Sequence, residues 1–165
     1  MRRRHVIPGC TRCSTRAQEA GHYSAQVSKP KKDDPSPLDL SDLGPYANAL
    51  GITVTTAGPD LVEATWTVTE ALLQPYGMTH GGAHCAVVET LASLAASLWL
   101  GPEGRVVGTT NSTDFYRATG TGDALTSITR PLHRGRSRQV WRVETFDDQE
   151  RLVAAGQVAI QNLRG

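Results

Sequence analysis

Lysine is missing from most of this chain. The three lysines of the 165-residue sequence all lie in residues 1–38, where eight Lys/Arg and three Asp/Glu give a net charge of +5. Residues 39–165 hold nine Arg and thirteen Asp/Glu, which gives a net charge of −4. Proteins that bind nucleic acid through charge present an excess of basic residues to the phosphates. Residues 39–165 do not fit that class, so no nucleic-acid partner is expected.

Cysteine is scarce, and an apolar leader is missing. Three cysteines are an odd number, and Cys10 and Cys13 lie in the basic first part, so no disulfide framework is predicted. The start MRRRHVIPGCTRCSTR lacks the apolar run of a secretory signal. Its arginine-rich, acid-poor composition resembles a transit peptide, but a disordered extension is the favoured interpretation. A reducing compartment, the cytoplasm, is the expected location.

The composition divides the chain into two parts. Residues 1–38 are basic, polar and proline-rich, which predicts a disordered N-terminal extension. Within them, the two cysteines of CTRC together with His5 and His22 are four residues of the types that bind zinc. Their spacing matches no known zinc finger, so cysteines without a metal-binding role are the favoured interpretation. Residues 39–165 are long enough to bury a core and are predicted to form a single domain.

The order of elements in residues 39–165 predicts the fold class. A short helix within 38–51 is followed by a hairpin, because apolar and polar residues alternate over 62–68. A long helix is expected from about Gly82 to Leu100, since residues 83–100 hold no Pro or Gly and Gly-Pro follows them. Four further strands are expected over residues 105–117, 124–134, 137–146 and 151–163. Their short connections predict antiparallel neighbours, and the whole predicts an α+β domain whose antiparallel sheet wraps around one long helix.

The long helix could by length be a membrane span, but it carries one acid, Glu89, near its middle. A carboxylate near the bilayer centre is costly, and no Lys/Arg cluster flanks the helix, so a buried core helix is favoured and no membrane is expected. A carboxylate on a core helix is costly too, and such residues cluster at active sites. Ser93 and Ser97 follow one and two turns later on the same face. A carboxylate at an oligomer interface or paired with arginine is the alternative.

His80-Gly81-Gly82 stands at the start of this helix. The first N–H groups of a helix have no partner within the helix, and glycine lets a carbonyl oxygen approach them closely, as in an oxyanion hole. Glu89 lies roughly two turns further along the helix, too far to reach a carbonyl bound there, unless a neighbouring subunit supplies the acid. The alternative is that the glycines only ease a tight turn.

Gln74, His80-Gly81-Gly82, Glu89 and Ser93, in this order, resemble the hotdog-fold acyl-CoA thioesterases. The similar branch is that of the phenylacetate-pathway (PaaI-like) and aryl-CoA enzymes. The segments TDFYRAT, LHRGRSRQVW and DDQERLVAAGQ add to the resemblance, which covers about residue 39 to the end of the chain.

The resemblance implies a role for each of these residues. Glu89 is the expected catalytic carboxylate, as nucleophile or as general base on water, and the Gly81 N–H is the expected oxyanion donor. Gln74 and His80 are expected to position the thioester, and Ser93 to assist the water or the leaving group. The resemblance also implies a site shared across a homodimer, doubled to a homotetramer. It implies no metal and no separate cofactor, since CoA is part of the substrate.

Basic residues crowd the predicted hairpin around Gly135, and arginine suits phosphate. His133, Arg134 and Arg136, with Arg117 elsewhere, are candidate contacts for the CoA phosphates, against the alternative of a solvated turn.

Four further patterns have two interpretations each. His80 and His84 are four residues apart as metal ligands can be, but no further ligand motif accompanies them. Cys85 is interpreted as a buried thiol rather than a nucleophile. Asn111-Ser112-Thr113 matches a glycosylation sequon but is interpreted as a strand edge near the site. The three tryptophans (Trp66, Trp99 and Trp141) are interpreted as core or interface residues.

The expected function is hydrolysis of an acyl-CoA, or of an aryl-CoA, to the free acid and CoA. Two alternatives remain, a non-catalytic acyl-CoA-binding hotdog module and a hotdog dehydratase.

Overall fold

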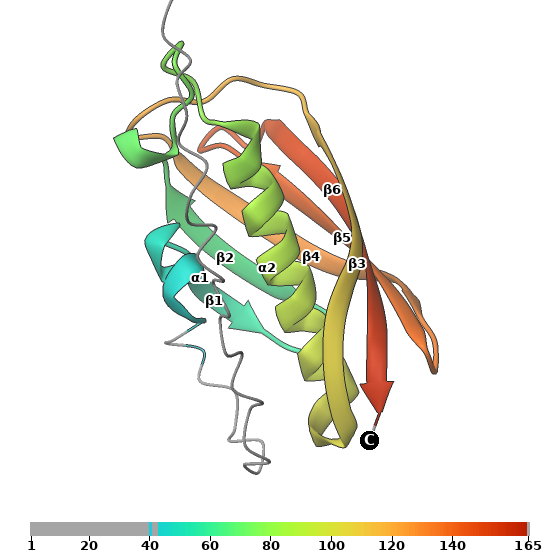
Figure 1. Cartoon of the computed structure of the whole chain (residues 1–165). Helices are drawn as coiled ribbons and strands as arrows, with labels where there is room; N and C mark the ends of the chain where they lie inside the picture. Colours follow the sequence, from blue (N-terminus) through green and yellow to red (C-terminus); the bar gives the residue numbers. More distant parts are fainter. Residues whose placement is uncertain (1–39, 41–42, 165) are drawn as a thin grey trace, which may run out of the picture. The chain divides into compact units, whose positions relative to one another are not determined.

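The computed structural model describes residue 40 and residues 43–164, and the predicted extension with its CTRC lies outside them. The described elements are α1 (Pro45–Ala49), β1 (Thr53–Ala57), β2 (Val62–Thr67), the 3-10 turn η1 (Glu70–Leu72), α2 (Gly81–Leu100), the 3-10 turn η2 (Gly101–Glu103), β3 (Gly104–Phe115), β4 (Ala124–Arg134), β5 (Arg138–Phe146) and β6 (Leu152–Arg164) (Figure 1). The predicted order of elements is confirmed.

One six-stranded antiparallel sheet packs against the long helix α2 (Figure 1). The strand order is β1-β2-β4-β5-β6-β3, so β3 is an edge strand that pairs with β6. The expectation that β3 and β4 are neighbours because a short segment joins them is wrong. That segment does not form a hairpin turn, because Thr119 bonds instead to Thr79 in the loop before α2, through its carbonyl and its hydroxyl.

The helix α2 begins and ends where its sequence predicts. The His80 side chain accepts a hydrogen bond from Gly82 N at the start, and Gly101 ends the helix in the left-handed region at φ 67°. Among the described residues, α2 is the one helix long and apolar enough to cross a membrane by length and composition. Half of its 20 residues are buried, and it contacts β2, β3, β4, β5 and β6, which makes it the core helix of the domain.

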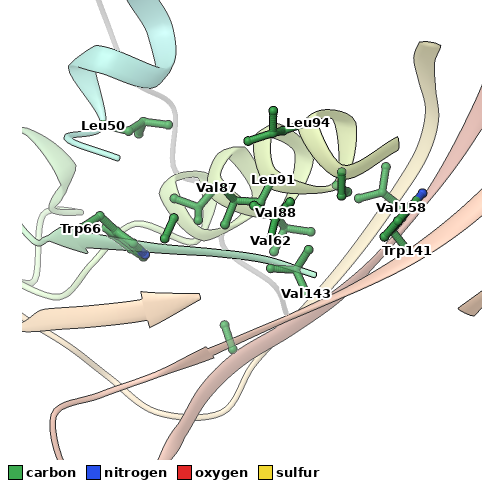
Figure 2. Packing of buried hydrophobic residues seen from close by; sticks show 14 of the residues in the cluster. Leu50, Val62, Trp66, Val87, Val88, Leu91, Leu94, Trp141, Val143 and Val158 are labelled. Atoms are coloured by element: carbon green, nitrogen blue, oxygen red, sulfur yellow. The ribbon is translucent and has the colours of Figure 1, made fainter. Parts of the chain in front are cut away.

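The core lies between α2 and the inner face of the sheet. Val87, Val88 and Leu91 of α2 are fully buried and face the strands that carry Val62 and Val143 (Figure 2). Alternation along β2 gives the expected buried face, Val62, Ala64 and Trp66. Trp66 and Trp141 are buried and Trp99 is half-buried, so the interpretation of the tryptophans as core residues is confirmed.

A buried polar network ties the β4–β5 turn to the end of α2. Asn162 Nδ2 donates to the carbonyls of Gly135 and Arg136 at 3.0 and 3.1 Å. Gln139 Nε2 donates to Asn162 Oδ1 at 2.6 Å and to the α2 carbonyl of Ala96 at 3.4 Å, and Trp141 Nε1 donates to Gln139 Oε1 at 2.8 Å. Every member is bonded, so the network fixes the turn without leaving buried polar atoms unpaired.

Candidate active site

Glu89 projects from the middle of α2 onto the edge strand β3. Its Oε2 accepts a hydrogen bond of 3.0 Å from Asn111 Nδ2, which also donates to the carbonyl of Cys85 one turn earlier. The other carboxylate oxygen, Oε1, lies where a side chain on Gly108 would begin, so a Cβ at that position would collide with it. Glu89 is half-buried, and its carboxylate lies between the side-chain amide of Asn111 and the backbone of Gly108.

A second hydrogen bond fixes the orientation of the Asn111 amide. Thr113 Oγ1 donates to Asn111 Oδ1 at 2.7 Å, so the amide oxygen is occupied and the amide nitrogen faces Glu89. Asn111 and Thr113 are two residues apart on one strand and therefore share its inner face. From the sequence, residues 111–113 are expected only as a strand edge near the site. The alternation of residues along a strand predicts which of them share a face, but it does not predict which residue of the helix that face contacts.

The start of α2 forms a second polar centre. His80 Nδ1 accepts from Gly82 N at 2.8 Å, so this imidazole acts as the helix cap. Within residues 43–164, no acceptor is hydrogen-bonded to the N–H of Gly81. A Cβ on Gly81 would lie 2.8 Å from Cε2 of Phe115, whose ring covers that position. A side chain at position 81 would therefore displace the Phe115 ring, and the Gly81 N–H is available to bind an oxygen.

Gln74 lies in a short loop that leads to this centre. Gln74 N donates to the carbonyl of Met78 at 2.8 Å, and its Oε1 accepts from Tyr76 N at 2.8 Å. The hydroxyls of Thr79 and Thr119 lie 2.7 Å apart and connect this loop to the segment that follows β3. That segment also holds Arg117, so Gln74, the helix start and Arg117 are grouped at one end of α2.

Glu89 does not belong to that group within one chain. It lies eight residues after Gly81, about 12 Å along the helix axis at 1.5 Å per residue. Ser93 lies one further turn away from Gly81 and is half-buried on the same face as Glu89. The described chain therefore carries two separate polar centres, one at the helix start and one at the helix middle.

The basic hairpin lies at the far end of α2. Arg134 donates to Asp60 Oδ1 at 2.7 Å and to the carbonyl of Pro59, and its guanidinium lies 5.7 Å from the ring centroid of Trp99. Arg134 thus has internal partners, whereas His133 and Arg136 are exposed near the turn. The structure does not bring these residues near Gly81 of the same chain.

His84, in the sequence a candidate metal ligand only, is a buried polar residue in the structure. It lies one turn into α2, is 4% exposed, and its Nδ1 has no hydrogen-bond partner. Burial lowers the pKa of His84 from 6.5 to about 4, so the ring is neutral at pH 7. Cys85, expected to be buried, is half-buried instead, and the role of its carbonyl as an acceptor for Asn111 explains its place beside the site.

Comparison with known proteins places the chain in a family. The family model of the Thioesterase superfamily matches residues 76–154. The proofreading thioesterase EntH of Cronobacter sakazakii is 40% identical over 114 residues, which cover 69% of this chain and 82% of that protein.

Two solved structures show that the similarity includes the fold. The structure of S. sahachiroi AziG superposes with a TM-score of 0.73 at 53% identity, covering 74% of this chain and 99% of that one. The structure of the E. coli PaaI protein, from the phenylacetic acid degradation operon, superposes with a TM-score of 0.67 at 26% identity, covering 73% and 85%. The predicted resemblance is confirmed: the chain belongs to the Thioesterase superfamily and is a thioester hydrolase with the hotdog fold.

Proposed function

We propose that the chain hydrolyses acyl-CoA thioesters, including aryl-CoA thioesters, to the free acid and CoA. The observation that carries the proposal is the held carboxylate: Thr113 orients Asn111, and Asn111 donates to Glu89 at 3.0 Å. A free backbone N–H at Gly81 supplies the complementary group, a donor for the oxygen that becomes negative when the carbonyl is attacked. A thioester is already electrophilic, so these two groups suffice for the reaction.

Two routes use the same groups. As general base, Glu89 takes a proton from water while the water oxygen bonds to the carbonyl carbon, and the C–S bond then breaks as the proton passes to the leaving thiolate. As nucleophile, Glu89 bonds to the carbonyl carbon and expels the thiolate, and water then cleaves the resulting anhydride. Single-turnover hydrolysis in ¹⁸O-water separates them, because only the second route labels the Glu89 carboxylate. Ser93 is proposed to assist the water or the leaving group in either route.

Gly81 and Glu89 are separated by about 12 Å along the axis of α2, and this separation leads us to propose a site shared by two chains. The strand β3 is 12 residues long and pairs only with β6 among the described strands, so its other edge offers unpaired N–H and C=O groups to a second β3. Phe115 lies at the end of β3 that is next to Gly81, and Gly108 lies on the part of β3 that is next to Glu89. Antiparallel pairing about a twofold axis near Asn111 would set residue 115 of one chain opposite residue 107 of its partner, which brings unlike half-sites together.

The remaining partner assignments are proposed as well. Arg117 near the helix start, and His133 and Arg136 at the β4–β5 turn, are proposed contacts for the CoA phosphates. Arg134 is a weaker candidate, because Asp60 already neutralises it. The homodimer is proposed to double to a homotetramer in the cytoplasm, and no metal is assigned to the reaction.

A thiol-release assay with a panel of acyl-CoA and aryl-CoA substrates tests the reaction. We expect release by the wild type and a loss of about 10³-fold or more in Glu89→Gln, which keeps the shape but cannot accept a proton or attack. Binding of CoA thioesters without any thiol release by the wild type would instead mean a non-catalytic binding module. Full activity in Glu89→Gln would remove Glu89 from the mechanism.

Mixed dimers test the shared site. Glu89→Gln removes the carboxylate of one half-site, and Gly81→Val is expected to inactivate the other, because its side chain displaces the Phe115 ring and crowds the proposed oxyanion donor. When the two inactive variants are co-expressed, about a quarter of wild-type activity should return, because half of the dimers are mixed and each mixed dimer has one intact site. If each site were built within one chain, co-expression would return no activity.

A further inference from the structure

A buried histidine that the mechanism does not use lies beside the proposed oxyanion donor. His84 is 4% exposed, and its ring contacts Trp66 edge-to-face at 5.4 Å and Phe115 at 5.8 Å between centroids. Phe115 is also the side chain that covers Gly81. His84 is therefore separated from the Gly81 N–H by one aromatic ring.

The unpaired Nδ1 of His84 is unusual and has no internal explanation. Buried polar atoms in native proteins almost always have a partner, and an unpaired one costs about 1–3 kcal/mol. Trp66, whose ring contacts His84, does not supply a partner, since its Nε1 donates to Ser127 Oγ at 3.1 Å and Ser127 pairs with Thr145 at 2.9 Å. A phenylalanine would make the same ring contacts without this cost.

The substrate can supply the missing partner. An acyl group whose carbonyl oxygen binds the Gly81 N–H must extend from the helix start, and His84 lies three residues on, where residues share one helix face. The Phe115 ring contacts His84 and lies against Gly81, and it is half-exposed, so it can turn aside to admit an acyl group. A hydroxyl group suits the imidazole nitrogen in either tautomer, because it can both donate and accept.

We propose that His84 lines the acyl end of the site and hydrogen-bonds through Nδ1 to a hydroxyl group of the acyl portion of the substrate. This inference rests on the proposed function and makes His84 a specificity-determining residue. The neutral imidazole neither attracts nor repels a carboxylate charge, so the preference is for a neutral hydroxyl group over an unsubstituted acyl group.

Matched substrate pairs measure this preference directly. We would compare kcat/KM for benzoyl-CoA with that for its 2-, 3- and 4-hydroxy derivatives, whose rigid ring carries the hydroxyl at three fixed distances from the carbonyl. In the wild type we expect one isomer to exceed benzoyl-CoA by about 10- to 100-fold. In His84→Phe we expect that ratio to fall close to one.

Two further variants distinguish the contribution of the Nδ1 atom from that of the imidazole ring. His84→Asn keeps a polar atom near the Nδ1 position and should retain part of the preference, whereas His84→Gln moves the polar atom further out and should not. Thr90→Val is the matched control, since its hydroxyl bonds locally to the Ala86 carbonyl on the same helix. A merely structural histidine would give equal ratios in the wild type and His84→Phe, and that result would overturn the proposal.

Stability provides an independent readout. Because His84→Phe removes an unpaired buried nitrogen and keeps the ring contacts, its melting temperature should equal or exceed that of the wild type. A clear drop would mean that Nδ1 has a structural partner and would count against a ligand role. Should the wild type release no thiol from any of the four substrates, the proposed function fails, and calorimetric binding of the same thioesters still tests His84. Equal affinities for the four compounds would then overturn this inference as well.

Discussion

Gly108 offers the most direct test of the position of Glu89. The residue lies on the inner face of β3, and a Cβ there would collide with Glu89 Oε1. Gly108→Ala adds this one carbon and changes no charge. The collision involves the end of a flexible side chain, so the carboxylate can move aside without disturbing the strand.

The expected magnitude follows from that contact. Ordinary van der Waals contact with a Cβ begins at 3.4 Å, so the carboxylate has to withdraw by roughly 1 Å or more. A misplacement of this size costs about 10²-fold in rate. Alanine in a strand interior is otherwise favoured over glycine by about 0.5–1 kcal/mol, so the free energy of unfolding should stay constant or rise. Activity and stability are therefore expected to change in different directions.

The assay is thiol release at saturating substrate, combined with urea unfolding of the same preparations. Gly58→Ala is the matched control, since its Cβ would meet its nearest atom, the carbonyl oxygen of Leu61, at an ordinary 3.6 Å. We expect kcat to fall about 100-fold in Gly108→Ala and to stay at the wild-type level in the control. Wild-type kcat in Gly108→Ala would refute the assignment of the carboxylate at this position as the reacting group. A loss of activity that parallels a loss of folded protein would refute the structural reasoning.

Four further predictions concern other residues. Asn111→Leu removes the donor to Glu89, the proposed catalytic carboxylate, and should lower kcat roughly tenfold or more with little change in KM, which steady-state kinetics would show. Asn162→Ala leaves the carbonyls of the β4–β5 turn unpaired and should cost about 2–3 kcal/mol in urea unfolding, and an unchanged midpoint would contradict this. Burial lowers the pKa of His84 to about 4, so as the pH falls below 6.5 the unfolded chain binds a proton at this residue before the folded chain does. Up to about 3 kcal/mol of stability is therefore lost as the pH falls from 6.5 to 4. This loss should be absent in His84→Phe. Arg136→Gln should raise KM for acyl-CoA about three- to tenfold, and Arg130→Gln on the outer sheet face should not, so equal values would remove the turn from CoA binding.

The local pattern of the sequence was sufficient for the elements and for two of the candidate groups. The limits of α2 follow from a stretch without Pro or Gly that ends at Gly101, and the core face of β2 follows from alternation over residues 62–68. The unpaired N–H of Gly81 was also predictable, because free N–H groups at a helix start are a local property. Glu89 was identifiable as a costly residue on a core helix for the same reason.

The partners of Glu89 were decided only by the tertiary structure. Asn111 and Gly108 are 22 and 19 residues away in the chain, and they meet Glu89 because β3 pairs with β6 at the edge of the sheet rather than with its sequence neighbour β4. Strand order and register depend on packing between distant segments, and a shift of one residue would turn Asn111 to the outer face. The buried, unpaired Nδ1 of His84 became visible in the same way, because the burial of a polar atom is a property of its surroundings and not of its own sequence.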